Sequence, residues 1–223
     1  MKRWIYLALL SSASPTVAQS FDAARAFGVR ESIEQASLSP DGTKLAYLIP
    51  ITGQGSAVMI ARLDVPDAVP KRIMEASGDP ERLSQCRWAS NTRLVCRAYA
   101  VSKVEGTILA TISRIVSFND DGSKIAVLQH NRGTGDRLGY ALFGGAVIDW
   151  NPGENQVLMI RQYIPETSTG TRLAQRMEGI GVDAVDPVTL KIKVVEPAQR
   201  NASEFITDGR GTVRIRGMSE VRD

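Results

Sequence analysis

The sequence predicts an all-β protein built from about four repeated units of short antiparallel strands. Turn signals containing Asp-Gly or Pro-Gly separate short runs of β-branched and aromatic residues along the chain. Hairpin patterns recur near residues 38–48, 86–96, 146–160 and 203–216. Their spacing of roughly 45–60 residues is typical of repeat architectures. Helical patterns are sparse: residues 21–27 suit a short helical entry, and we interpret 172–179 as a loop.

The first hairpin, residues 37–48 (SLSPDGTKLAYL), carries the clearest turn signal. Proline presets φ, Asp41 can bond the local backbone, and Gly42 accepts a left-handed conformation. Eighty positions later, residues 117–128 (SFNDDGSKIAVL) repeat the serine, the Asp-Gly, the lysine, the alanine and the leucine in place. A shorter version follows at 206–217. Because the offset of 80 is not one unit, we expect the first two copies at different hairpins of their units.

Further β-type runs lie between these hairpins. Beside the strands flanking the first turn, 36–39 and 44–51, we expect strands at 57–63, 107–112, 111–118, 123–129, 180–185 and 191–196. A single hairpin cannot bury its apolar face, so neighbouring units must stack. A four-stranded blade repeated around an axis achieves this. The sequence therefore predicts a partial β-propeller of about four blade units over residues 19–223. A β-sandwich, which has a similar turn spacing, is the alternative.

The first 18 residues have the pattern of an export signal. Lys2 and Arg3 precede a short apolar run, and small residues at Thr16 and Ala18 fit a cleavage site. An uncleaved anchor is the alternative. Cleavage after Ala18 would lower the net charge from +3 to +1. So small a positive charge does not indicate nucleic-acid binding. We expect a periplasmic or secreted protein without a membrane span after cleavage.

Cys86 and Cys96 lie in two β-type runs separated by the turn residues 90–92. If those three residues form the loop, Ala89 faces Arg93 and the two cysteines face each other across the hairpin. Directly opposed residues have β-carbons within disulfide range, and the compartments that exported proteins reach are oxidising. We therefore expect a disulfide. A one-residue slip would instead leave two buried thiols. Two cysteines and the single histidine, His130, cannot complete a zinc shell.

The repeated hairpin resembles the WD40-like repeat of TolB-type propellers. More of the chain is similar to the propeller of S9 serine peptidases, the prolyl oligopeptidase family. The stretches that carry this resemblance are residues 27–48, 111–128, 141–163 and 204–215. The resemblance implies a propeller that covers, and filters substrates for, a following α/β-hydrolase domain with a Ser-Asp-His triad.

This sequence contains no G-x-S-x-G nucleophile elbow, so no catalytic residue is carried over from the resemblance. We expect no cofactor, and His130 lacks a motif that would place a nucleophile and a carboxylate beside it. The glycine-rich residues 132–145 fit neither phosphate-loop pattern. Arg210, Arg214, Arg216 and Arg222 are interpreted as a solvated strand face, the alternative being contact with a substrate carboxylate or a missing domain.

The expected function is therefore that of a non-catalytic N-terminal propeller fragment of an exported S9-type peptidase. Joined to its hydrolase domain, it would gate or position peptide substrates. The alternative is a self-standing exported TolB-like binding module that acts through protein contacts. The expected partners are the missing hydrolase domain or a peptide substrate. Open blade edges would also favour self-association of the isolated chain.

Overall fold

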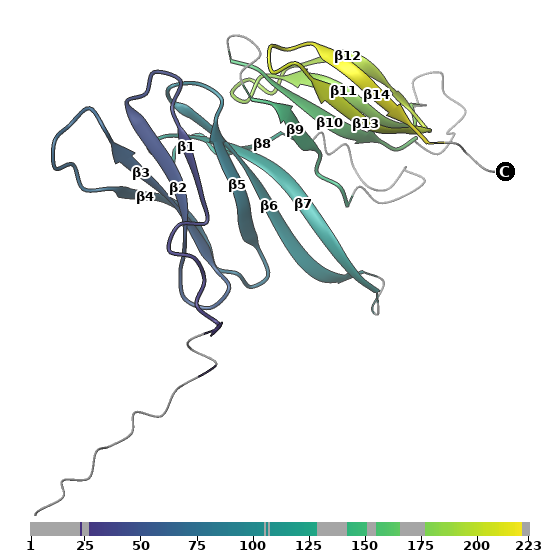
Figure 1. Ribbon diagram of the computed structural model, residues 1–223. Helices are drawn as coiled ribbons and strands as arrows, with labels where there is room; N and C mark the ends of the chain where they lie inside the picture. Colours follow the sequence, from purple (N-terminus) through teal and green to yellow (C-terminus); the bar gives the residue numbers. More distant parts are fainter. Residues whose placement is uncertain are drawn as a thin grey trace, which may run out of the picture. The chain divides into compact units, whose positions relative to one another are not determined.

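The computed structural model describes Ala23, residues 27–104, Gly106, 108–128, 142–150, 155–165 and 177–219. The chain divides into two units, Met1–Arg30 and Glu31–Asp223, and every strand belongs to the second. Within the described residues, fourteen strands form three four-stranded sheets and one two-stranded sheet (Figure 1). All neighbouring strands are antiparallel, and each sheet follows the order of the chain.

We refer to each sheet as a blade. Blade 1 contains β1 (Gln35–Leu38), β2 (Lys44–Pro50), β3 (Ser56–Arg62) and β4 (Lys71–Ala76). Blade 2 contains β5 (Arg82–Trp88), β6 (Arg93–Val104), β7 (Ile108–Asn119) and β8 (Ala126–Val127). Blade 3 contains β9 (Ala146–Asp149), β10 (Val157–Tyr163), β11 (Gly179–Val185) and β12 (Ile192–Gln199). The fourth unit contains β13 (Ala202–Thr207) and β14 (Val213–Met218).

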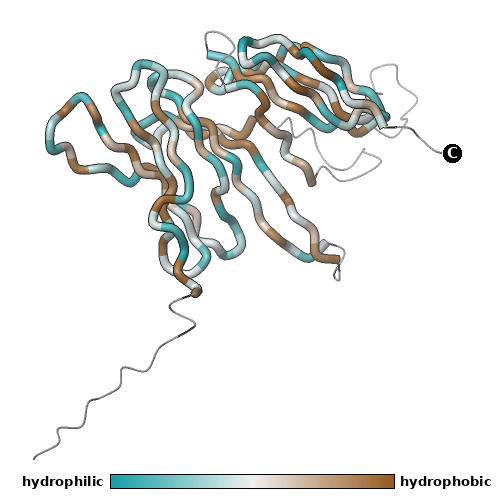
Figure 2. The backbone as a smooth tube through the Cα atoms, viewed as in Figure 1, coloured by the Kyte–Doolittle hydropathy of each residue, from teal (hydrophilic) through white to brown (hydrophobic). Residues whose placement is uncertain are grey.

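The blades stack face to face through three apolar clusters, because successive side chains of a strand point to opposite faces. In β6, Leu94 and Cys96 pack toward blade 1, whereas Val95, between them, packs toward blade 3. In β10, Val157 and Met159 likewise face blade 2. Figure 2 shows hydrophobic and hydrophilic residues alternating along the strands.

Blade 3 continues this stacking on its other face. Leu158, Val182 and Ala184 pack against Ala202 and Phe205 of the fourth unit. Blades 2 and 3 thus each bury both faces against neighbours. A sandwich has two layers with one buried face each, so the sandwich alternative is wrong and the partial propeller of four blade units is confirmed.

The four hairpins predicted at regular spacing are the first hairpins of the four units: β1–β2, β5–β6, β9–β10 and β13–β14. The repeated motif is also placed as expected, with its first copy at β1–β2 and its second at β7–β8. The sequence missed β4, a half-exposed strand with three charged residues among six. The two runs predicted around 107–118 are one strand, β7. The predicted helix at 21–27 and the turn at 151–153 lie largely or wholly outside the described residues.

A buried arginine ties blade 2 to blade 3. Arg93 is 2% exposed, and its guanidinium donates to the Pro187 carbonyl at 2.6 and 3.1 Å. It also donates to Ser117 Oγ at 2.8 Å and to the Lys124 carbonyl at 2.9 Å. Burial lowers the pKa of Arg93. Because a buried guanidinium needs many acceptors, this set of partners fixes the turn after β11 against β6 and β7.

Candidate functional site

The turns β1–β2, β3–β4, β5–β6 and β7–β8 share one end of blades 1 and 2, since strands of an antiparallel meander alternate in direction. One hydrogen bond joins a turn of blade 1 to a turn of blade 2, and another joins the two turns of blade 2. The Asp41 N–H donates to Asn91 Oδ1 at 3.0 Å, and the Asp120 N–H donates to the Thr92 carbonyl at 3.0 Å. This end of the two blades is therefore one connected surface.

The two copies of the repeated motif form the same turn. In the first copy, Asp41 Oδ1 accepts from Ser39 Oγ at 2.6 Å and from the Thr43 N–H at 3.0 Å. In the second, Asp121 Oδ1 accepts from the Ser123 N–H at 2.8 Å. These bonds lower the pKa of both carboxyl groups, Asp41 chiefly through Ser39 and Asp121 chiefly through Ser123. The aspartate of the motif is thus a turn-stabilising residue.

The two turns differ in their surroundings. Gly42 and Gly122 both have positive φ, of 72° and 82°. A methyl group on Gly42 would meet nothing within 4 Å, whereas one on Gly122 would lie 2.8 Å from the Ile73 carbonyl oxygen in β4. The second turn therefore packs against blade 1, and this contact closes one side of a pocket.

The pocket has a volume of about 640 Å³, and we call it the turn pocket. Its lining residues come from blade 1 and from the β7–β8 turn: Lys44, Ile60, Arg62, Ala68, Val69, Lys71, Arg72, Ile73, Asp120 and Asp121. Four cationic side chains and two carboxylates thus surround an apolar wall. Such a combination of apolar surface and a few converging polar groups is typical of ligand sites.

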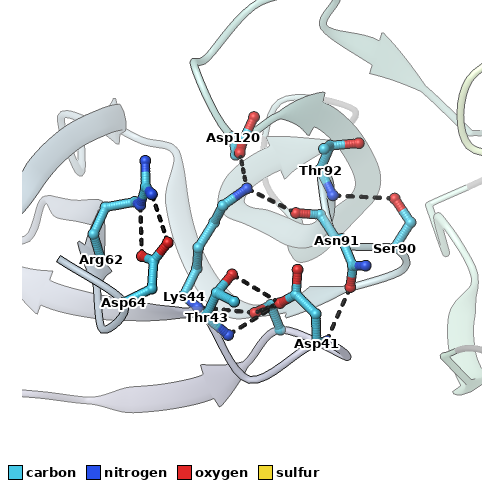
Figure 3. A network of polar contacts seen from close by, with 10 residues as sticks. Asp41, Thr43, Lys44, Arg62, Asp64, Ser90, Asn91, Thr92 and Asp120 are labelled. Atoms are coloured by element: carbon cyan, nitrogen blue, oxygen red, sulfur yellow. Dashed lines mark hydrogen bonds and ion pairs between the residues drawn. The ribbon is translucent and has the colours of Figure 1, made fainter.

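Lys44 is the centre of the charged network (Figure 3). Its ammonium contacts Asp120 Oδ2 at 2.5 Å and donates to the Asn91 carbonyl at 3.0 Å, and it lies 5.7 Å from the centre of the Trp88 ring. Lys44 belongs to blade 1, whereas its three partners belong to blade 2. The lysine of the first motif copy therefore joins the two blades at the edge of the pocket.

The other cations of the pocket differ in how they are neutralised. Arg62 makes a two-point ion pair with Asp64, and Arg72 pairs with Glu75 at 3.0 Å. In the described part of the chain, Lys71 makes no ion pair. An exposed lysine without a carboxylate partner is free to contact an anionic group of a ligand.

Blade 3 contains a separate cluster of three bonded polar side chains, centred on Asp183. Asp183 is fully buried, and its Oδ2 accepts from Arg161 at 3.0 Å and from the Tyr163 hydroxyl at 2.7 Å. Burial, together with the Asp183 bond, raises the pKa of Tyr163. Because all three side chains lie on the face that packs toward blade 2, we interpret them as an internal brace of the blade stack.

The predicted disulfide pair is opposed in the β5–β6 register, with Ala89 facing Arg93 across a loop of Ser90–Thr92. The Cys86 and Cys96 sulfur atoms are bonded at 2.04 Å, and both side chains are buried between blades 1 and 2.

His130, Arg222 and most of 132–145 lie outside the described residues. Arg214 pairs with Asp208, and Arg216 pairs with Glu196.

Sequence reasoning missed the turn pocket. The lysine shared by both motif copies, at positions 44 and 124, was the available signal.

Among the residues that the structure describes, no cluster of three or more potential metal ligands occurs. In that same part of the chain, no helix has the length and hydrophobicity needed to cross a membrane.

The chain matches no protein-family model and no curated protein. Several solved structures are similar to it, among them the following three. Pyrococcus horikoshii acylaminoacyl peptidase has 12% identity and a TM-score of 0.44, with 81% of this chain and 27% of that chain covered. TolB from Acinetobacter baumannii has 13% identity and a TM-score of 0.43, with 86% and 44% covered.

The third is a puromycin-hydrolyzing peptidase from Mycobacterium tuberculosis, with 14% identity and a TM-score of 0.34. The match covers 76% of this chain and 29% of that one. In all three cases the chain spans less than half the length of the protein it resembles. No family is assigned from these similarities; the propeller assignment depends on the strand pairing and blade stacking described above.

Proposed function

We propose that this chain is a non-catalytic propeller that positions peptides, as the N-terminal part of an exported S9-type serine peptidase. The observation that supports the proposal is the turn pocket, which lies between two stacked blades and carries paired and unpaired cations beside two carboxylates. Arginine and lysine are not general bases at neutral pH. The two carboxylates are already bonded, Asp120 to Lys44 and Asp121 to the Ser123 N–H. This lining therefore suits recognition of charged groups rather than proton transfer.

A short peptide has the chemistry that this pocket would recognise. Lys71 can contact a terminal carboxylate, and Asp121 can accept from a terminal ammonium. Ile60 and Ile73 supply apolar surface for a side chain between the two ends. Gating would follow from the same contacts, since a peptide held at the turn end is positioned before it reaches a hydrolase domain.

Binding of short peptides tests this proposal. Tripeptides with free termini, and the same peptides with an amidated C-terminus, are titrated into the protein by calorimetry. We expect saturable binding that amidation weakens and that Lys71→Gln weakens about tenfold, the loss of one charge-assisted hydrogen bond. Lys193→Gln, which changes an exposed lysine of β12 outside the pocket, is the matched control and leaves the affinity unchanged. Equal effects of both substitutions, or no saturable binding, would contradict the proposal.

The link to a peptidase has its own test. An in-frame or frameshifted G-x-S-x-G coding segment immediately downstream in the genome is expected, and an unrelated neighbouring gene would argue against it. A self-standing TolB-like module that acts through protein contacts is the second candidate. It is favoured by the exposed apolar residues Val101, Ile108 and Leu109 on the β6–β7 hairpin.

A further inference from the structure

The β6–β7 hairpin extends well beyond the rest of blade 2. Both strands have twelve residues and pair along their whole length. The pairing of β5 with β6 ends at Tyr99, and the pairing of β8 with β7 covers Val116 and Ser117. Residues 100–104 and 108–112 therefore form a two-stranded extension, which we call the ribbon (Figure 1).

Backbone hydrogen bonds of β7 just beyond the ribbon show which N–H and C=O groups of this strand point away from β6. The Ser113 N–H donates to the Leu142 carbonyl at 3.0 Å, and the Ile115 carbonyl accepts from Leu128 at 2.9 Å. Odd-numbered residues of β7 thus direct their backbone groups away from β6. By the same alternation, Leu109 and Thr111 present an N–H and a C=O each at the outer edge of the ribbon. No partner for these groups occurs among the described residues.

The two edges of the ribbon differ in charge. On the β6 side, Val101 and Lys103 carry the outward backbone groups, and a lysine on an edge strand is a common protection against pairing. On the β7 side, residues 108–112 read Ile-Leu-Ala-Thr-Ile and contain no charge. The Ile108 and Leu109 side chains are 60% and 68% exposed. Within the part of the chain that the structure describes, the β7 edge is therefore the edge without a protecting charge.

We propose that the β7 edge of the ribbon pairs with the same edge of a second copy of this chain. An antiparallel pairing centred on Ala110 sets Leu109 opposite Thr111 of the second copy, and Thr111 opposite its Leu109. Both pairs exchange the outward N–H and C=O groups, so the edge is self-complementary about a two-fold axis. No like charges face each other in this register. Two ribbons then form one four-stranded sheet.

The same register predicts a specific cross-link. Ala110 would face Ala110 of the second copy in a non-hydrogen-bonded pair, where the Cα atoms are about 4.5 Å apart. Cys86 and Cys96 form a pair of this kind within the chain, with a Cα–Cα distance of 4.1 Å and a disulfide between them. Ala110→Cys should therefore give a disulfide-linked dimer under mild oxidation. Ser102→Cys, on the β6 strand across from Ala110, is the matched control and should form little disulfide-linked dimer.

Oligomeric state provides the second measurement, by light scattering over a range of concentrations. We expect wild-type protein to dimerise. Thr111→Pro removes the outward N–H of β7 without affecting the β6–β7 ladder, and it should raise the dissociation constant at least tenfold. Val101 lies directly across the ribbon from Thr111. Val101→Pro removes an outward N–H from the β6 edge instead, and it should leave the dissociation constant of the dimer unchanged. Circular dichroism verifies that both variants fold.

Three results would overturn the proposal: a wild-type monomer at all concentrations, equal effects of the two proline substitutions, and equal cross-linking of the two cysteine variants. The cross-linking result does not depend on the proline variants folding. Peptide binding at the turn pocket is measured separately, so failure of the proposed function and failure of this dimer can be distinguished.

Discussion

A glycine-to-alanine substitution in each copy of the repeated turn gives a direct test of blade stacking. Gly42 and Gly122 occupy equivalent positions, with φ of 72° and 82°. Alanine at either position carries the strain of a left-handed conformation, about 1–2 kcal/mol. This part of the cost is common to both substitutions and comes from the local backbone.

The second part of the cost is specific to Gly122. A methyl group there would lie 2.8 Å from the Ile73 carbonyl oxygen and 3.3 Å from its Cγ2 atom. Since a β4 backbone atom cannot move aside as a flexible side chain does, blade 1 must shift relative to the β7–β8 turn. Forced overpacking of this kind costs about 1–3 kcal/mol. At Gly42, the methyl group would meet nothing within 4 Å.

Urea unfolding followed by circular dichroism measures the difference. We expect Gly42→Ala to lower the free energy of unfolding by about 1–2 kcal/mol and Gly122→Ala by at least about 1 kcal/mol more. Gly122→Ala should also weaken peptide binding, because Ile73 lines the turn pocket. Equal losses of stability in the two variants would refute the reasoning, since they would mean that the second turn does not contact β4.

Three further measurements follow from buried and charged groups. Arg93→Met removes the donors to the Pro187 carbonyl and should lower the free energy of unfolding by about 1–3 kcal/mol in urea; an unchanged midpoint would exclude a role for this contact in stability. Replacing both Cys86 and Cys96 with alanine opens a loop with a sequence separation of 10, which should cost about 3 kcal/mol, and wild-type protein should migrate differently on gels with and without reductant after alkylation. The depressed pKa of Asp41 means that its contribution to stability is present above the unfolded pKa of about 4 and is lost as the pH falls through the lower folded value. Asp41→Asn should therefore flatten the loss of stability between pH 5 and pH 3, and an unchanged pH profile would contradict this.

Much of the fold follows from local sequence patterns. The Asp-Gly turns, the hairpin spacing and the opposition of the two cysteines depend on residues close together in the chain, and the structure places them as predicted. The strand β4 was missed because half of its residues are charged and it is half exposed, so alternation in its sequence is weak. The hairpin predicted near 86–96 is longer in the structure, because β6 continues to Val104 and its last residues pair with β7 alone.

The turn pocket could not be found in the same way. Lys44 and Asp120 are 76 positions apart, and their contact exists because two blades stack and bring two turns together. The motif copies look equivalent in sequence, yet Gly42 faces open space whereas Gly122 packs on Ile73. A charged residue in a turn gives no local sign of which neighbour it will meet.

The sequence by itself determined the all-β class, the four repeated units and the turn chemistry of Asp41 and Asp121, because short-range bonds and strand periodicity encode these features. The tertiary structure alone decided which faces of each blade are covered, where the turn pocket lies, and which edge of the ribbon is left open. Those features depend on packing between segments that are distant in the chain, and that packing is set by the fit of whole apolar faces.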